Sequence, residues 1–251
     1  MSLDPDELVS VAERFGVADE QVQRDHAISH MLAALARTAA DHVVFFGGTA
    51  LSRTHLMNLR LSEDIDLIAI GPRTEAARAV TNAFDAGPVR RELGRITWRP
   101  DLGVARGSAA AVAITATGHA VKVQLLSGQG YPSWPSELVP IQQRYSDVPA
   151  ASLRVLTRDA FAASKLSAWI DRRTSRDLYD LWAMVGAGMI TTGAADLFCR
   201  LGQRTRVPER AVIAVEPSDD WVTALGGQTR IAIDQGSAAD VVANAWSAVR
   251  Q

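Results

Sequence analysis

The 251-residue sequence has one cysteine, two lysines and no long hydrophobic run. Because the single cysteine, Cys199, cannot form an internal disulfide, the disulfide-stabilised folds of small secreted proteins are excluded. No apolar stretch approaches the roughly 18 residues that a membrane-spanning helix needs. The acidic N-terminus, MSLDPDELVSVAERFG, resembles neither a signal peptide nor an anchor. We therefore expect a cytoplasmic protein that does not associate with a membrane.

The overall charge does not single out nucleic acid as a partner. The formal net charge is −2, and 47% hydrophobic with 22% charged residues is the composition of a globular protein. Between residues 158 and 210, however, 9 basic residues stand against 6 acidic ones. Any contact with RNA is therefore expected to be local and to lie in the C-terminal half.

Segments of helical and strand character alternate along the first half of the chain, and helical spacing dominates the second half. This order predicts an α/β (α+β) fold. Four prolines between residues 132 and 149 mark a loop-rich crossing. We expect an α/β domain with N-terminal helices over residues 1–150 and a helical domain over residues 151–251. The expected helices include residues 6–38, 49–59 and 74–84, and the expected strands are 42–46, 64–70, 95–99, 110–117 and 120–126.

A first candidate site lies in the segment HVVFFGGTALSRTHLMNLRLSEDIDLIAI, residues 42–70. Successive side chains alternate along a strand, so Asp64 and Asp66 share one face and lie about 7 Å apart. Such a carboxylate pair can hold Mg²⁺, which prefers oxygen ligands. An acidic pair at the start of a strand can equally be a solvated turn. This face turns apolar at Ile68, however, and acids at the rim of a buried face need a partner or a metal.

Gly47 and Gly48 end the apolar strand before this acidic pair and precede a predicted helix. Backbone N–H groups at such a helix start can bind phosphate, and Thr49 adds a hydroxyl group. A glycine pair after a strand is more often only a tight turn, and a hydroxyl there is also an ordinary cap. Beside the acidic pair, the glycines suggest a site for a nucleoside triphosphate (NTP) and its metal.

A second candidate site lies in KLSAWIDRRTSRDLYDLW, residues 165–182. Lys165 and Arg176 lie on a predicted basic stripe at helical spacing. The helix is expected to break before Arg176, with Ser175 capping a new helix that carries Asp177 in its first turn. The Lys165 ammonium suits a triphosphate, and Asp177 could hold its orientation. The alternative is a solvated helical hairpin with internal ion pairs.

The sequence GGTALSRTHLMNLRLSEDIDL, followed from residue 165 by KLSAWIDRRTSRDLYDL, resembles the AbiEii/MenT family of nucleotidyltransferase-like toxins. The stretch QVQRDHAISHMLAAL also resembles the helix before the glycine pair in that family. The resemblance implies a DNA polymerase β-like nucleotidyltransferase core with a mixed sheet, followed by a helical C-terminal domain. It further implies nucleotide transfer from an NTP to RNA, notably the 3′ end of tRNA, which blocks translation. A cognate antitoxin would be the protein partner.

The resemblance also implies roles for individual residues. Asp64 and Asp66 would be the Mg²⁺ ligands, Lys165 would contact the triphosphate, and Asp177 would be a further catalytic acid. Ser62 would lie beside the metal as a site of inhibitory phosphorylation. The residues that would bind the nucleotide are Gly47, Gly48, Thr49, Ser62 and Arg176.

One position departs from this pattern. Many enzymes with this fold carry a third carboxylate on a neighbouring strand, where this sequence has AVKVQLL with Lys122 and Gln124 on one face. A neutral amide binds Mg²⁺ less strongly than a carboxylate and cannot act as a base. Two alternatives therefore stay open. The same core could transfer a nucleotide to a protein or a small molecule, or the chain could be a non-catalytic nucleotide-binding module.

Overall fold

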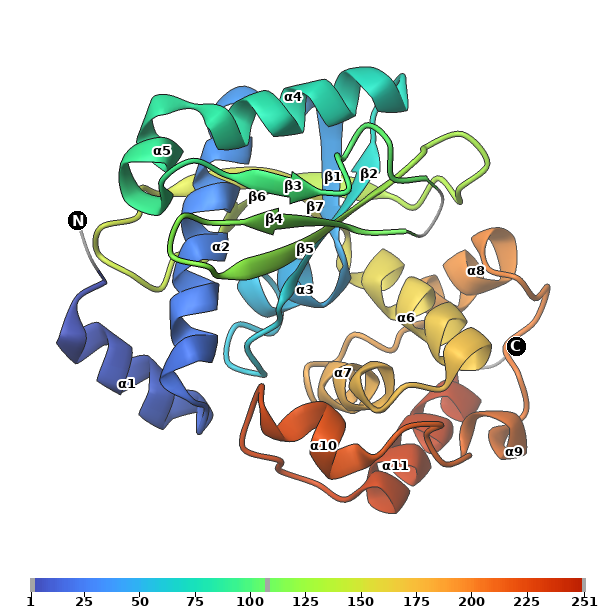
Figure 1. Cartoon of the computed structure of the whole chain (residues 1–251). Helices are drawn as coiled ribbons and strands as arrows, with labels where there is room; N and C mark the ends of the chain where they lie inside the picture. The colour runs from blue at the N-terminus through green and yellow to red at the C-terminus, as the bar shows by residue number, and fades with distance from the viewer. Residues whose placement is uncertain (1–2, 107–108, 250–251) are drawn as a thin grey trace. The chain divides into compact units, whose positions relative to one another are not determined.

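The computed structural model describes residues 3–106 and 109–249, and the chain divides into two compact units (Figure 1). The first unit comprises Met1–Tyr131 and Glu137–Val155. The second comprises Pro132–Ser136 and Leu156–Gln251. Among the described residues, no helix is both long enough and apolar enough to cross a membrane.

A seven-stranded mixed sheet with the order β3-β4-β5-β2-β1-β7-β6 forms the centre of the first unit. Strand β2 is antiparallel to β1 and parallel to β5, and β1 is parallel to β7. The predicted α/β class with a mixed sheet is thereby confirmed. The strands are β1 (Val43–Phe46), β2 (Asp64–Ala69), β3 (Thr97–Arg99), β4 (Ala111–Ile114), β5 (Ala120–Leu126), β6 (Ser136–Ile141) and β7 (Ala151–Leu156).

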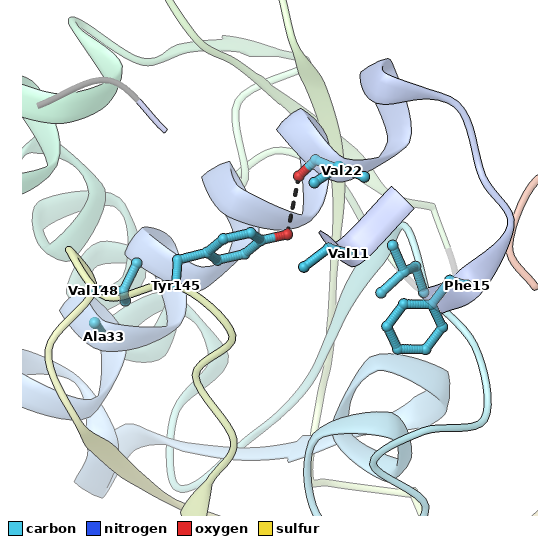
Figure 2. Packing of buried hydrophobic residues seen from close by; sticks show 7 residues of the cluster. Val11, Phe15, Val22, Ala33, Tyr145 and Val148 are labelled. Carbon is cyan, nitrogen blue, oxygen red and sulfur yellow. Dashed lines mark hydrogen bonds between the residues drawn. The ribbon is translucent and has the colours of Figure 1, made fainter. Parts of the chain in front are cut away.

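The N-terminal region predicted as helical forms two helices, because Gly16 adopts a φ of +68° and ends the first of them. The second is buried along most of its length. Both contribute to an apolar cluster in which Tyr145 points toward Val22 (Figure 2). The helices of the first unit are α1 (Pro5–Phe15), α2 (Asp19–Thr38), α3 (Gly47–Arg53), α4 (Arg73–Asp85) and α5 (Gly87–Leu93), with a 3₁₀ turn, η1, at Ala40–His42.

Helix α3 differs from the predicted helix over residues 49–59 at both ends. It begins at Gly47, so the glycine pair forms its first turn, and it ends at Arg53. The backbone N–H of Gln142 donates to the Arg53 carbonyl at 2.8 Å. That carbonyl is the acceptor that the next helical turn would need. Pairing with a segment far away in the sequence therefore ends the helix early.

The second unit is helical. Helices α6 and α7 pack on each other, α8 packs on α6, and α11 packs on α7. The side chains of Trp169, Tyr179 and Trp246 are buried between them, as expected for core rather than base-stacking aromatics. The helices are α6 (Arg158–Arg172), α7 (Ser175–Gly186), α8 (Thr192–Leu201), α9 (Arg210–Ile213), α10 (Trp221–Gly226) and α11 (Gln235–Ala248).

Candidate active site

Asp64 and Asp66 lie on one face of β2, as predicted, and both side chains are partly exposed. In the parallel neighbour β5, Lys122 pairs with Asp64 and Gln124 pairs with Asp66. Residues in register on adjacent strands present their side chains on the same face. Gln124 therefore lies next to Asp66, at the place expected for a third carboxylate.

The glycine pair packs closely against this acidic strand. Phe46 pairs with Asp66 across the antiparallel strands, which brings the next residue, Gly47, over the carboxylate. A Cβ atom at Gly47 would lie 2.0 Å from Asp66 Oδ2. A Cβ atom at Gly48 would lie 2.4 Å from Arg60 Nη2 and 2.9 Å from Ser62 Oγ. A side chain at either position would have to displace these groups, so the start of α3 lies close against the Asp66 carboxylate.

Thr49 and Ser62 are buried in the same region. The Thr49 hydroxyl donates a hydrogen bond to the Asp64 carbonyl, which fastens α3 to the start of β2. With its hydroxyl engaged in this way, Thr49 can offer a phosphate its backbone N–H. The first unit thus brings together six of the predicted site residues, which are Gly47, Gly48, Thr49, Ser62, Asp64 and Asp66.

Replacing Gly47 with alanine tests this packing. The added methyl group overlaps Asp66 Oδ2, and the φ of +76° at this position disfavours any side chain. We expect a loss of about 1–2 kcal/mol in stability from the backbone conformation. Displacement of the carboxylate should lower nucleotide-dependent activity further, by about ten- to a hundredfold.

Gly71→Ala is the matched control for this variant. Gly71 has a φ of +77°, and no atom lies within 4 Å of a Cβ atom added there. It carries the same backbone strain without the contact with Asp66. Urea unfolding and an activity assay on both variants separate the two effects. Equal activity in both would show that the close approach of Gly47 to Asp66 is unimportant.

The second unit holds Lys165 and Asp177 in a buried ion cluster. Lys165 Nζ lies 3.0 Å from Asp177 Oδ1 and 2.6 Å from Asp180 Oδ2. The exposed fraction of the side chain is 8% for Lys165 and 1% for each aspartate. An ammonium group has three donors, and these two bonds leave one of them for a further anion. The predicted lysine–aspartate contact is therefore present, with Asp180 as a second partner.

Asp177 also accepts hydrogen bonds from outside this pair. Arg172 donates through Nε at 2.6 Å and through Nη2 at 2.8 Å, and the Thr174 hydroxyl donates at 2.7 Å. Burial alone would raise the pKa of Asp177, but the Lys165 and Arg172 charges outweigh it and hold the pKa well below its usual range. A carboxylate with this many donors stays ionised at neutral pH. Its geometry suits the positioning of Lys165 better than proton transfer.

The turn between α6 and α7 falls where it was predicted, but its cap is different. Arg173 ends α6 with a φ of +54°, and Thr174 rather than Ser175 is the N-cap of α7. The Ser175 hydroxyl donates to Asp219 Oδ1 at 2.8 Å. Ser175 is instead the first residue of the helix, and its backbone N–H also donates to Asp219 Oδ1, at 2.7 Å. Arg176 follows in the first turn of α7 and is partly exposed.

Two buried polar groups of the first unit were not predicted from the sequence. Asp25 of α2 has a fully buried side chain that binds Arg53 Nη2 at 2.7 Å. His26, the next residue of the same helix, and His30, about one turn further on, lie against Asp147. The sequence signal for these groups was the segment RDHAISH, which places polar residues at positions of the helix where the helical spacing predicts a buried face. Their partners lie more than 25 residues away in the sequence, so spacing alone could not reveal them.

Comparisons with known proteins identify a family for this chain. The sequence profile of a family described as "Nucleotidyl transferase AbiEii toxin, Type IV TA system" matches residues 30–245. A search of curated protein sequences found no match.

Solved structures share the fold of this chain. MenT4, a nucleotidyltransferase toxin from Mycobacterium tuberculosis H37Rv, is similar with a TM-score of 0.72 and 21% identity, over 96% of this chain and 89% of that chain. JHP933 from Helicobacter pylori is similar with a TM-score of 0.56 and 15% identity, over 93% of each chain. At these identities the likeness establishes the fold and does not transfer a substrate.

Proposed function

This chain belongs to the AbiEii family of nucleotidyl transferase toxins, and from that premise we propose that it transfers a nucleotide from an NTP to an RNA acceptor. We propose the 3′ end of tRNA as the acceptor, with a block of translation as the result, and a cognate antitoxin as the protein partner. The observation that carries this proposal is the close approach of Gly47 to the Asp66 carboxylate. It supports the proposal because it brings backbone N–H groups, which at a helix start can bind phosphate, beside the carboxylates that would hold a metal.

The residues of the first unit fit a hard divalent cation. Asp64 and Asp66 present carboxylates on one face, and Gln124 adds an amide group in register with Asp66. Oxygen donors of this kind suit Mg²⁺. Asp64 and Asp66 would hold the ion, which when bound neutralises phosphate charge and lowers the pKa of the attacking hydroxyl.

The other residues would bind and orient the triphosphate. Backbone N–H groups of Gly47, Gly48 and Thr49 at the start of α3 would donate to phosphate oxygens. The remaining donor of Lys165, with Arg176, would neutralise charge on the departing pyrophosphate. Asp177 would hold Lys165 in place rather than act as an acid. In the reaction, the RNA 3′-hydroxyl gives up its proton to water, its oxygen bonds to the α-phosphorus, and the bond from that phosphorus to pyrophosphate breaks.

The deciding experiment is nucleotide labelling. Purified protein is incubated with total tRNA, Mg²⁺ and each labelled NTP in turn, beside an Asp64→Ala variant. Label at the RNA 3′ end that is absent with the variant supports the proposal and identifies the nucleotide. Label on a protein or a small molecule instead would show a different acceptor. Transfer to RNA should also weaken steeply as salt is raised, because phosphate contacts release counterions.

Gln124 gives a prediction of its own. Replacing Gln124 with aspartate adds a third carboxylate beside Asp66, and a higher ligand charge strengthens cation binding. We expect the Mg²⁺ concentration for half-maximal activity to fall by about threefold or more. Gln129→Asp is the control, because Gln129 is exposed and lies outside β5. An increase in the Mg²⁺ requirement of Gln124→Asp would mean that the amide, and not an acid, is what this site needs.

A further inference from the structure

Two histidines of α2 and one aspartate from the segment between β6 and β7 meet at a single point in the first unit. His26 and His30 are four residues apart, so they lie on the same face of the helix. His26 Nε2 lies 3.2 Å from His30 Nε2 and 3.0 Å from Asp147 Oδ2, and His30 Nε2 lies 3.4 Å from the same oxygen. These three atoms form a nearly equilateral triangle.

Hydrogen bonds alone cannot account for all three contacts among these atoms. A neutral imidazole carries one ring hydrogen, so the two Nε2 atoms supply at most two hydrogens for three contacts. If both nitrogens donate to Asp147, the contact between the two nitrogens has no hydrogen. If one nitrogen donates to the other, the carboxylate loses a donor. A cation at the centre of the triangle would interact favourably with all three atoms.

The dimensions of the triangle fit a zinc ion. Zn–N bonds of about 2.0–2.1 Å in tetrahedral geometry place two ligand atoms about 3.3 Å apart. The three measured separations are 3.2, 3.0 and 3.4 Å. Two imidazole nitrogens and one carboxylate oxygen are also a donor set that divalent transition metals prefer, whereas Mg²⁺ prefers oxygen alone.

The three side chains are buried and held in place by their surroundings. Their exposed fractions are 9% for His26, 7% for His30 and 11% for Asp147. The Tyr145 ring packs edge-on against His26, with 4.9 Å between the ring centroids. Its hydroxyl donates to the Val22 carbonyl of α2 at 3.2 Å (Figure 2). The segment that carries Asp147 is therefore fastened to the helix that carries both histidines.

We propose that His26, His30 and Asp147 bind a divalent transition-metal cation, with Zn²⁺ as the ion that the donor set favours. The site is separate from the Asp64 and Asp66 carboxylates and takes a different class of ion. Three protein ligands leave a fourth position for water. Binding would join α2 to the segment between β6 and β7, and would stabilise the first unit without entering the transfer reaction.

Metal binding to untagged protein tests the proposal, since a histidine tag would itself bind zinc. The protein is stripped with a chelator and titrated with ZnCl₂ by calorimetry in the presence of excess Mg²⁺. We expect one zinc per chain with micromolar or tighter affinity. At a free zinc concentration about a hundred times the Kd, the Tm should rise by about 5–10 °C. Binding weaker than millimolar, or displacement by Mg²⁺, would overturn the proposal.

Variants locate the ion. His30→Gln and Asp147→Asn should each weaken zinc binding by about a hundredfold, because each removes one of three ligands. His42→Gln is the control, since His42 lies in η1, outside the cluster, and should bind as the unchanged protein does. Equal zinc affinity in all of these proteins would place the ion elsewhere and overturn the proposal.

If these variants fail to fold, a measurement on the unchanged protein can still test the site. Co²⁺ bound in a tetrahedral site with nitrogen and oxygen ligands gives intense visible absorption, whereas octahedral Co²⁺ gives weak bands. An intense spectrum that one equivalent of Zn²⁺ abolishes would support the site. Weak octahedral bands would contradict the tetrahedral geometry. Neither readout depends on nucleotide transfer, so failure of the transferase proposal would leave this test unaffected.

Discussion

Replacing Asp66 with asparagine is expected to lower kcat/KM for nucleotide transfer by about a thousandfold and to leave the fold intact. Asparagine has nearly the same size and shape as the aspartate that packs against Gly47, but its neutral amide cannot supply the negative charge that the proposed cation site needs. A metal ion contributes several kcal/mol to transition-state stabilisation, and each 1.36 kcal/mol corresponds to about tenfold in rate. Initial rates of label transfer at saturating RNA give the ratio of kcat/KM between the variant and the unchanged protein. An unchanged Tm would show that the fold is intact.

The neighbouring Glu63 provides the control. Its carboxylate pairs with Arg24 Nη1 at 2.9 Å, and 36% of its side chain is exposed. Glu63→Gln makes the same chemical change one residue before β2, and we expect a change of less than about twofold, since exposed ion pairs contribute little. If Asp66→Asn kept more than about a tenth of the activity, Asp66 would not be an essential metal ligand. If Glu63→Gln were equally impaired, the loss would reflect the charge of the segment as a whole.

Local patterns in the sequence predicted the elements that carry the candidate site. The strand that carries Asp64 and Asp66 and the helical hairpin that carries Lys165 and Asp177 each depend on short-range spacing, and each was found as expected. The strand was recognisable as a short apolar run, opened by Asp64, Ile65 and Asp66 and ended by Gly71 and Pro72. The turn at Thr174 was recognisable because hydroxyl residues interrupt the helix. The catalytic and binding roles of these residues stay predictions.

Contacts between distant segments were not predictable in the same way. The end of α3 at Arg53 involves Gln142, and Ser175, the first residue of α7, is bound by Asp219, which lies 44 positions away. The Asp25–Arg144 contact joins residues 119 positions apart. The spacing of apolar residues within a short stretch of sequence predicts which face of a helix or strand is buried. It carries no information on which charged side chain will meet another on that face.

The Asp25 contacts form a buried charged cluster in the first unit. Its carboxylate lies 2.7 Å from Arg53 Nη2 and 3.3 Å from Arg144 Nη1, and the Tyr145 hydroxyl donates to it at 2.9 Å. Asp25 and Arg53 have no exposed side-chain surface, and Arg144 has 2%. Burial lowers the pKa of Arg53 to about 10, so this guanidinium still carries its charge at neutral pH. One carboxylate therefore compensates two buried cations.

Replacing Asp25 with asparagine is expected to lower the free energy of unfolding by about 3–5 kcal/mol, because it leaves two buried guanidinium groups without a counter-charge. Asp19→Asn, an exposed change in the first turn of the same helix, should stay within about 0.5 kcal/mol. Tyr145→Phe removes the hydroxyl that Asp25 and the Val22 carbonyl share as a donor, and should cost about 1–2 kcal/mol. Urea unfolding at pH 7 measures all three. A loss below about 1 kcal/mol for Asp25→Asn would show that water reaches the cluster.

The same cluster sets how the difference in stability between the unchanged protein and Asp25→Asn depends on pH. Burial alone would raise the pKa of Asp25, but the Arg144 and Arg53 charges outweigh it, and the pKa is lowered from its ordinary value. A lowered pKa in the folded protein means that the carboxylate stabilises the fold fully above its unfolded pKa of about 4, and that this stabilisation is lost as the pH falls through the folded pKa. The gap in stability between the unchanged protein and Asp25→Asn should therefore be constant from about pH 5 to pH 8 and narrow below about pH 4. A gap that narrowed near pH 6 instead would show that a group other than Asp25 controls the difference in stability.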